Sequence, residues 1–262
     1  MTGDDHTLAR DLADQAGQRL LDLRAHGGDP DVLRKAGDRL SHEFLTRELA
    51  DRRPGDVVLS EEGADNPARL DARRVWIVDP LDGTREFGEP GRTDWAVHVA
   101  LWERSGTSGP GDLTAGAVAL PAQGKVLSTT GAEQQQCSAG AGAGGASGRI
   151  RIVVSRTRAP QFVRDICDLI DAELVSLGSA GAKVAAVIDG EVDAYVHGGG
   201  FYEWDTAAPV VVARAAGLHV SRVDGSNVAY NQDNPYLPDI LVCRPAIAGL
   251  LLNAIREATH AI

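Results

Sequence analysis

The stretch WIVDPLDGTREF, Trp76–Phe87, is the segment of this chain that says most about its fold and its chemistry. An apolar run, Val75–Val78, leads directly into two aspartates that stand three positions apart, Asp79 and Asp82. Pro80 between them fixes φ and removes a backbone donor, so we expect it to end the ladder of a buried strand. The pattern therefore predicts two carboxylates at the tip of a strand.

A helix is expected to begin immediately after these aspartates. Gly83 permits a tight turn, and Thr84 is a suitable N-cap or first-turn residue for a helix that starts with REF. The N–H groups and the dipole of such a terminus favour a phosphate. Both carboxylates would then lie beside a phosphate-binding position.

Composition limits the classes of protein that this chain can belong to. It has 262 residues, of which 43% are hydrophobic, enough for one large α/β domain or two small ones. It contains no apolar run near the roughly 18 residues of a membrane span, and its polar, acidic N-terminus does not resemble a signal peptide. Three widely spaced cysteines favour neither disulfides nor a thiolate zinc site. We expect a cytoplasmic protein without a membrane partner.

The formal charge of −11 argues against a nucleic-acid polymer as partner, because phosphate backbones require Lys and Arg. Any phosphorylated substrate should therefore be small. Metal cations held by carboxylates could attract it despite the net charge of the protein.

The order of elements predicts layered α and β structure. Amphipathic helices are expected over residues 8–26 and 31–52, followed by short strands and then by strands that alternate with helices. A Gly/Ala-rich linker at 138–148 divides the chain into an N-terminal α+β half, 1–148, and a C-terminal α/β half, 149–262.

Four carboxylates fall at expected element boundaries: Glu61, Asp79, Asp82 and Asp205. Together they form the hard-oxygen ligand set that Mg²⁺ prefers. Without cations they would repel one another, and some of their pKa values would rise. Two Mg²⁺ ions would remove this repulsion, activate a water and stabilise the leaving oxygen of a phosphate ester.

Three blocks, SEEG, WIVDPLDGTREF and EWDTAAP, stand in the order that is typical of the inositol monophosphatase superfamily. The chain resembles these Mg²⁺-dependent, Li⁺-sensitive phosphatases over nearly its whole length. The resemblance implies an αβαβα sandwich of the sugar-phosphatase type, with the two halves forming one catalytic unit and the metals where they meet. It also implies two or three ions, with Mn²⁺ as a substitute for Mg²⁺, and allows a homodimer.

The resemblance implies a role for each acidic residue. The first metal would be held by Glu61, Asp79 and the Leu81 carbonyl, and the second by Asp79, Asp82 and Asp205. It leaves room for a third, weaker ion at Glu62.

The same resemblance implies the catalytic groups. Thr84, oriented by Asp38, would deprotonate the attacking water together with Glu61, and the N–H groups of Gly83 and Thr84 would bind the scissile phosphate. In the block around Asp38, Lys35 replaces the threonine that is usual in the family.

Within the superfamily the chain looks most like the 3′(2′),5′-bisphosphate nucleotidases, which convert adenosine 3′,5′-bisphosphate to AMP. The segment GSAGAK, which contains Ser179 and Lys183, resembles their substrate-binding turn. The segment VVSRTR resembles another of their motifs, with Arg158 where a histidine is usual, and an arginine there still suits a phosphate.

Several alternatives stay open at this point. The same metal centre would serve inositol-1-phosphate or fructose-1,6-bisphosphate, and only pocket residues such as Arg158, Lys183, Tyr195 and Tyr202 could discriminate among these substrates. A member that binds nucleotide without catalysis is a further possibility. Haloacid-dehalogenase phosphatases also end a strand in D-x-D-G-T, but their aspartates are two apart and the first becomes phosphorylated. The spacing of three here favours metal ligation.

For two other features the sequence indicates a structural role and not a catalytic one. His98 lies in an apolar strand without metal-ligand spacing, so we expect it to be packed and not catalytic. Gly198–Gly200 is expected to form a loop that delivers Asp205 to the site.

Overall fold

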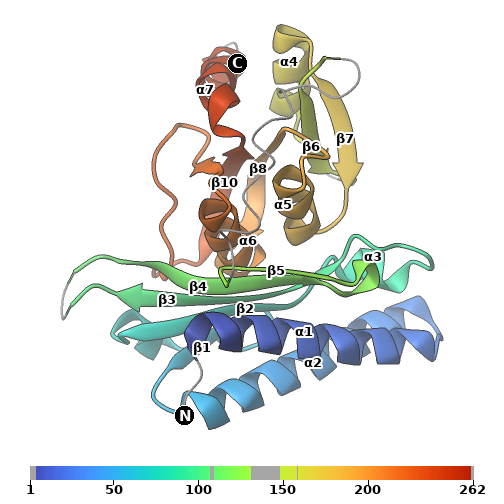
Figure 1. Ribbon diagram of the computed structural model, residues 1–262, viewed down its shortest axis with the longest axis vertical. Coiled ribbons are helices and arrows are strands. Elements are labelled where there is room, and N and C mark those ends of the chain that lie inside the picture. Colours follow the sequence, from blue (N-terminus) through green and yellow to red (C-terminus); the bar gives the residue numbers. More distant parts are fainter. Residues whose placement is uncertain (1–3, 107–108, 131–147, 158, 261–262) are drawn as a thin grey trace.

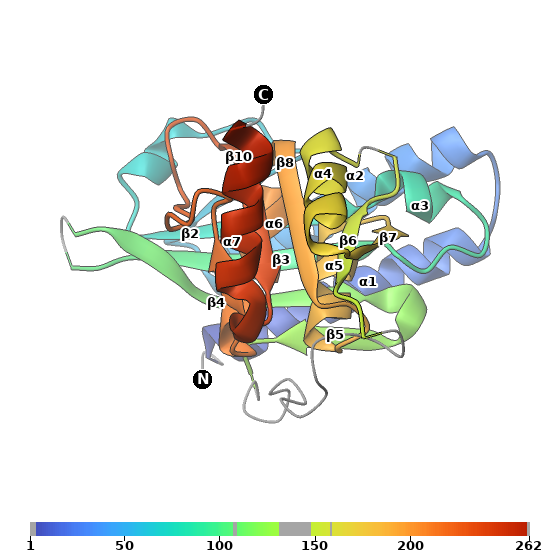
Figure 2. The same ribbon diagram turned by 90° about the horizontal axis from the view of Figure 1, so that it is seen from above.

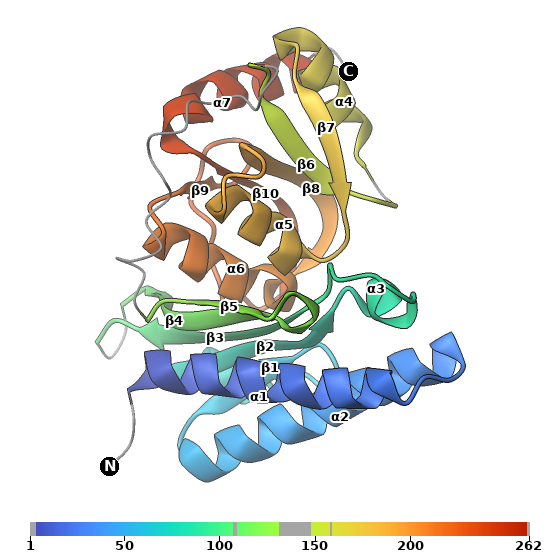
Figure 3. The same cartoon turned by 45° about the vertical axis from the view of Figure 1, so that its right-hand side comes forward.

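The computed structural model describes residues 4–106, 109–130, 148–157 and 159–260. They form five layers, in which pairs of helices alternate with two sheets (Figures 1 and 3). The order of elements in the sequence predicts layered α and β structure, and the family resemblance implies this αβαβα arrangement. Most of the predicted linker at 138–148 lies outside the described residues, so its conformation stays a prediction.

The outermost helices of the first half lie against one face of the first sheet. Helix α1 spans Asp5–Ala25 and helix α2 spans Pro30–Arg52. Asp4 and Asp29 cap them by accepting backbone N–H groups with their side chains, which satisfies donors that a helix start otherwise leaves unpaired. The apolar positions of α1 are buried against β3 and β4, as their helical spacing predicts.

The first sheet has the order β1-β2-β3-β4-β5. Strand β1 pairs with β2 in parallel, and the remaining neighbours are antiparallel. Short helix α3, Thr84–Gly88, follows β2 directly. The strands span Val57–Ser60 (β1), Arg74–Asp82 (β2), Ala96–Arg104 (β3), Gly111–Leu120 (β4) and Lys125–Ser128 (β5), with 3₁₀ turns η1 at Pro67–Leu70 and η2 at Pro121–Gln123.

The second sheet has the order β7-β6-β8-β10-β9 and is parallel on one side and antiparallel on the other. Helices α4, Gln161–Ile170, and α7, Pro245–His260, cover its outer face (Figure 2). The strands span Arg151–Ser155 (β6), Glu173–Leu177 (β7), Ala194–Tyr202 (β8), His219–Ser221 (β9) and Tyr236–Cys243 (β10).

The middle layer joins the two sheets. Helices α5, Ala180–Ile188, and α6, Glu203–Ala215, contact strands of both sheets, and a single apolar core continues from one half to the other. Gly116 allows α6 to approach β4 closely, because a Cβ at that position would overlap the Val211 side chain. This packing brings the start of α6 beside the end of β2.

Two local expectations are wrong. Gly198–Gly200 do not form a loop but belong to β8, where Gly198 pairs with Asp239 of β10. Pro80 does not end β2, since ladder pairing with β3 resumes at Asp82 after an irregularity. Both errors arise because strand pairing depends on the partner strand, which a reading of local residue preferences does not include.

Candidate metal-dependent active site

An irregularity in β2 sets the direction of the two aspartates. Asp79 pairs with His98 and Asp82 pairs with Ala96, so two residues of β2 stand opposite one residue of β3. In a regular strand, side chains three positions apart point to opposite faces of the sheet. The extra residue of the bulge removes this difference, so both carboxylates reach the same side.

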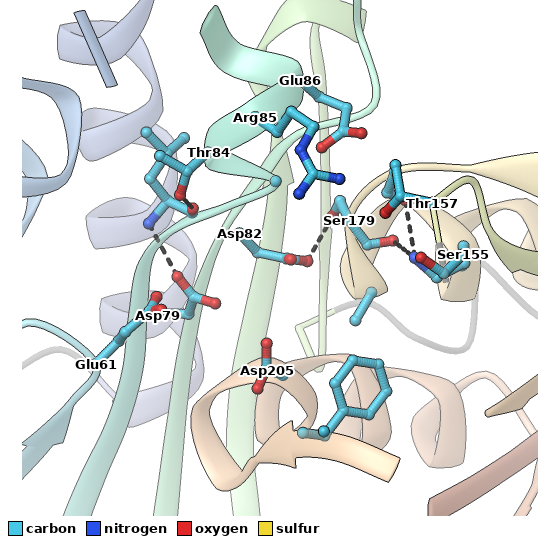
Figure 4. Close-up of a pocket in the computed structure, with 17 residues that line it drawn as sticks. Glu61, Asp79, Asp82, Thr84, Arg85, Glu86, Ser155, Thr157, Ser179 and Asp205 are labelled. Carbon is cyan, nitrogen blue, oxygen red and sulfur yellow. Dashed lines mark hydrogen bonds between the residues drawn. The ribbon is translucent and has the colours of Figure 1, made fainter. Parts of the chain in front are cut away.

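Asp205 completes a group of three carboxylates from the other half of the chain. It lies in the first turn of α6, where its Oδ2 accepts the Tyr202 N–H at 2.7 Å. One carboxylate oxygen from each of Asp79, Asp82 and Asp205 can be chosen so that all three lie within 4.8 Å of one another. In Figure 4 the three side chains converge from β2 and α6.

Repulsion among these carboxylates outweighs the opposing charge of buried Lys183, which lowers the pKa of Asp205 by less than Asp82 raises it. Burial, followed by the charges of Glu61 and Asp82, raises the pKa of Asp79 well above its usual value. Burial and the charge of Asp82 raise the pKa of Asp205 to about 8. Among the described residues, no lysine or arginine forms an ion pair with any of the three. Hard oxygens that repel one another in the absence of a counterion suit a divalent cation.

Glu61 stands at the edge of the same site. It lines the pocket but does not belong to the group of three whose oxygens lie within 4.8 Å. Partial removal from water, then the charges of Asp82 and Asp38, raise its pKa to about 7, although the residue remains exposed. A cation in the pocket would favour its charged form.

Two donors hold the carboxylate of Asp82 in place. Its Oδ2 accepts hydrogen bonds from Ser179 Oγ at 2.6 Å and from the Gly181 N–H at 2.9 Å. His98 Nε2 lies 3.3 Å from the same oxygen without making a hydrogen bond, while His98 Nδ1 lies 3.3 Å from the Trp204 carbonyl. The sequence identified His98 only as a packed residue, whereas the structure places it, fully buried, between two elements of the site.

The turn before α5 is held by the predicted substrate residues themselves. Ser179 adopts φ of 47° and caps α5 by accepting the Ala182 N–H at 3.0 Å. Lys183 Nζ donates to the carbonyls of Gly178 at 3.1 Å and Ser179 at 2.7 Å. Burial lowers the pKa of Lys183 to about 8. Its ammonium lines the pocket and stabilises the turn that positions Asp82.

Thr84 and Asp38 form the predicted pair. Thr84 Oγ lies 3.3 Å from Asp38 Oδ1 and 2.9 Å from the Leu81 carbonyl, and can donate to either. Burial, then the charge of Glu62, raise the pKa of Asp38 to about 6, while the Thr84 hydrogen bond lowers it. A carboxylate with this pKa is a better proton acceptor near neutral pH than an ordinary aspartate.

These groups surround a cavity of about 220 Å³ between the two halves. Its lining is mostly polar and includes all the predicted metal ligands except Glu62. Sequence reasoning gave no site role to several lining residues, although all but Phe201 lie within segments that it singled out: Arg85, Glu86, Ser155, Thr157, Gly200 and Phe201. Their motifs do not show which side chains face the cavity, and only the fold does.

Comparison with known proteins identifies the family. Residues 8–260 match the profile of the inositol monophosphatase family. This chain is a member of the inositol monophosphatase family. The family is metal-dependent, and the three clustered carboxylates could bind a metal.

Curated members of the family share much of this sequence. A 3′-phosphoadenosine 5′-phosphate phosphatase of Mycobacterium bovis is 54% identical over 245 residues, which cover 93% of this chain and 90% of that protein. A protein of the same name from Mycobacterium leprae is 52% identical over 97% of this chain and 94% of its own length. The 3′(2′),5′-bisphosphate nucleotidase CysQ of Escherichia coli K12 is 29% identical and covers 86% and 94% of the two chains.

Solved structures of family members have the same fold. Mycobacterium tuberculosis SuhB has a TM-score of 0.71 and 26% identity, with 97% of this chain and 96% of that chain covered. CysQ from Bacteroides thetaiotaomicron has the same TM-score and identity and covers 92% and 97%. Among the described residues, no helix is long and apolar enough to cross a membrane.

The structure places the remaining predicted site residues in different positions relative to the cavity. Glu62 lines a separate hollow beside α2, so a metal role for it stays a prediction. Arg158 lies outside the described residues. Tyr195 is fully buried in the core and cannot contact substrate, and Tyr202 stacks on Trp204 and does not line the pocket. The expectation that these two tyrosines discriminate substrates through this pocket is therefore wrong.

Proposed function

We propose that the protein is a Mg²⁺-dependent phosphatase that removes the 3′-phosphate of adenosine 3′,5′-bisphosphate and releases AMP. The observation that carries this proposal is a group of carboxylates, in a polar cavity beside Thr84, that forms no ion pair with any described lysine or arginine. The names of relatives at 52% and 54% identity support the choice of substrate. CysQ, at 29% identity, supports the same reaction class.

The residues that would hold the ions divide as the family resemblance implies. Glu61, Asp79 and the Leu81 carbonyl would hold one ion, and Asp79, Asp82 and Asp205 the other. Bound there, divalent cations supply positive charge to the phosphate and lower the pKa of a coordinated water. The choice of Mg²⁺ over Mn²⁺, and the number of ions, belong to this proposal.

The protein's own groups would then move the proton. Thr84 Oγ, within reach of Asp38, orients the attacking water, and Asp38 or Glu61 accepts its proton. The bond from phosphorus to O3′ breaks as the bond to the water oxygen forms, and O3′ leaves with a proton from solvent. Gly83 and Thr84 line the cavity where their N–H groups could stabilise the phosphate. No covalent phosphoenzyme is required.

Three substrates test this proposal in one experiment. We expect kcat/KM with Mg²⁺ to be highest for adenosine 3′,5′-bisphosphate, and lower for inositol-1-phosphate and fructose-1,6-bisphosphate. Asp79→Asn, purified in parallel, controls for contaminating phosphatase and should release almost no phosphate. Absence of phosphate release from adenosine 3′,5′-bisphosphate by the wild type would refute the substrate. Absence from all three would favour a member that binds ligand without catalysis.

A further inference from the structure

The cavity has two chemically different sides. The acidic side carries Glu61, Asp79 and Asp205, where the scissile phosphate and its cations would bind. On the other side, the guanidinium of Arg85 points into the cavity towards Ser179 and Thr157, away from Glu61 and Asp79 (Figure 4). Ser155 also lines this side. A second anion could therefore meet donors on the side of the cavity away from Glu61, Asp79 and Asp205, although Glu86 and Asp82 also line the cavity.

Arg85 is not engaged by the acids around it. It is exposed, and within the described part of the chain it makes no hydrogen bond or ion pair. Its neighbour Glu86 instead accepts a hydrogen bond from Arg156 at 2.8 Å, and Arg156 also pairs with Glu89 at 2.7 Å. The acid next to Arg85 in the sequence is thus held by another arginine, and the charge of Arg85 stays available.

The other described cation of the cavity is committed. Lys183 is buried, and its ammonium donates to two carbonyl groups of the turn before α5. Arg85 is therefore the cation of the described lining whose donors are all unused. A guanidinium offers several N–H groups in a planar fork that matches the oxygens of a phosphate. An exposed arginine is ordinarily solvated, but this one points into the cavity.

We propose that Arg85, with the hydroxyl groups of Ser155 and Thr157, binds the phosphate that the reaction leaves in place, the 5′-phosphate of the nucleotide. This inference rests on the proposed function and extends it. The acidic side would repel a second phosphate, so a substrate with two phosphates requires a cationic group elsewhere in the cavity. Arg85 would make the enzyme prefer a bisphosphate over a monophosphate with the same scissile bond.

Two substrates that differ only in the 5′-phosphate test the assignment. The wild type should have a higher kcat/KM for adenosine 3′,5′-bisphosphate than for 3′-AMP. In Arg85→Gln this preference should fall about 10- to 100-fold, mainly through KM of the bisphosphate, because a hydrogen-bonded charge is lost. Arg85→Lys should restore part of it. Arg10→Gln, on the exposed face of α1, removes the same charge and should keep the wild-type preference.

A binding measurement removes the dependence on turnover. AMP carries only the 5′-phosphate, so calorimetric titration of metal-free protein with AMP should show weaker binding to Arg85→Gln than to wild type. Adenosine, without any phosphate, should bind both proteins equally.

Each alternative result has one meaning. The assignment of Arg85 would be overturned if Arg85→Gln kept the wild-type preference for adenosine 3′,5′-bisphosphate over 3′-AMP. It would also be overturned if kcat/KM fell equally for both nucleotides. A wild type without preference for the bisphosphate over 3′-AMP would overturn it as well. Failure of the wild type to hydrolyse the bisphosphate at all would instead refute the proposed function.

Discussion

The clustered carboxylates lead to a prediction about stability: Asp205→Asn should stabilise the metal-free protein at pH 8. The pKa of Asp205 is raised from 3.8 to about 8. If the pKa of Asp205 is about 4 units higher in the folded than in the unfolded state, its carboxyl group lowers the free energy of unfolding at pH 8 by at most about 5–6 kcal/mol. Coupling to Asp79 and entry of water reduce this, so we expect a gain of about 2–3 kcal/mol. Asparagine can still accept the Tyr202 N–H, so the start of α6 is preserved.

The sign of the pH dependence follows from the direction of the shift. Below pH 3.8 the group is protonated in both folded and unfolded chains, so the substitution should have no electrostatic effect. Between that pH and about 8 the folded state binds the proton more tightly, so wild-type stability falls as pH rises. The advantage of Asp205→Asn should therefore increase with pH and become constant above about 8.

Thermal unfolding in chelator, at pH 5 and pH 8, measures this effect. A gain of 2–3 kcal/mol should raise Tm by about 4–12 °C in a chain of this size. Added Mg²⁺ should stabilise the wild type more than the variant, because it binds the folded state. Asp239→Asn is the matched control, and it should destabilise because Asp239 forms an ion pair with Arg222 at 2.6 Å. If Asp205→Asn were no more stable than wild type at pH 8 in chelator, the reasoning about unbalanced charge would be wrong.

Three further substitutions test other parts of the site. Asp82→Asn should lower kcat about 1000-fold or more, because a metal ligand contributes several kcal/mol, and near-normal turnover would contradict the ligand assignment. Thr84→Val should lower kcat about 100- to 10,000-fold while Thr84→Ser keeps most activity, and equal losses in both would argue against a role for the hydroxyl. Gly181→Ala should destabilise the protein by about 1–3 kcal/mol in urea unfolding, because its Cβ would overlap His98 Nε2; an unchanged midpoint would mean that the turn has room.

The spacing of apolar residues and the acidic motifs of the sequence predicted much of the fold. Helical spacing of apolar residues located α1 and α2 to within a few residues, and alternating patterns located most strands. The DPLDGT segment, together with the acidic pairs near Glu61 and Asp205, indicated a metal centre before any geometry was available. These signals are local: they depend on residue types at fixed spacings, and a sequence displays such spacings directly.

Other parts of the site could not be predicted in this way. A spacing of three between Asp79 and Asp82 predicts opposite faces in a regular strand, and only the pairing of β2 with β3 shows the bulge that reverses this. The sequence indicates Lys183 as a substrate ligand, and that role stays a prediction. The sequence does not show that two donors of the ammonium are bonded to carbonyl groups whose positions depend on the turn before α5. Backbone partners of this kind become visible only in three dimensions.

By itself, the sequence determined which elements form and which acidic side chains are candidates for the metal centre. Only the tertiary structure decided that Ser179 and the Gly181 N–H hold Asp82, that Arg156 engages Glu86, and that Arg85 is left facing the cavity. The physical reason is that pairwise electrostatic and hydrogen-bonding energies depend on distances between residues far apart in the chain. Those distances are set when α5 and α6 pack between the two sheets.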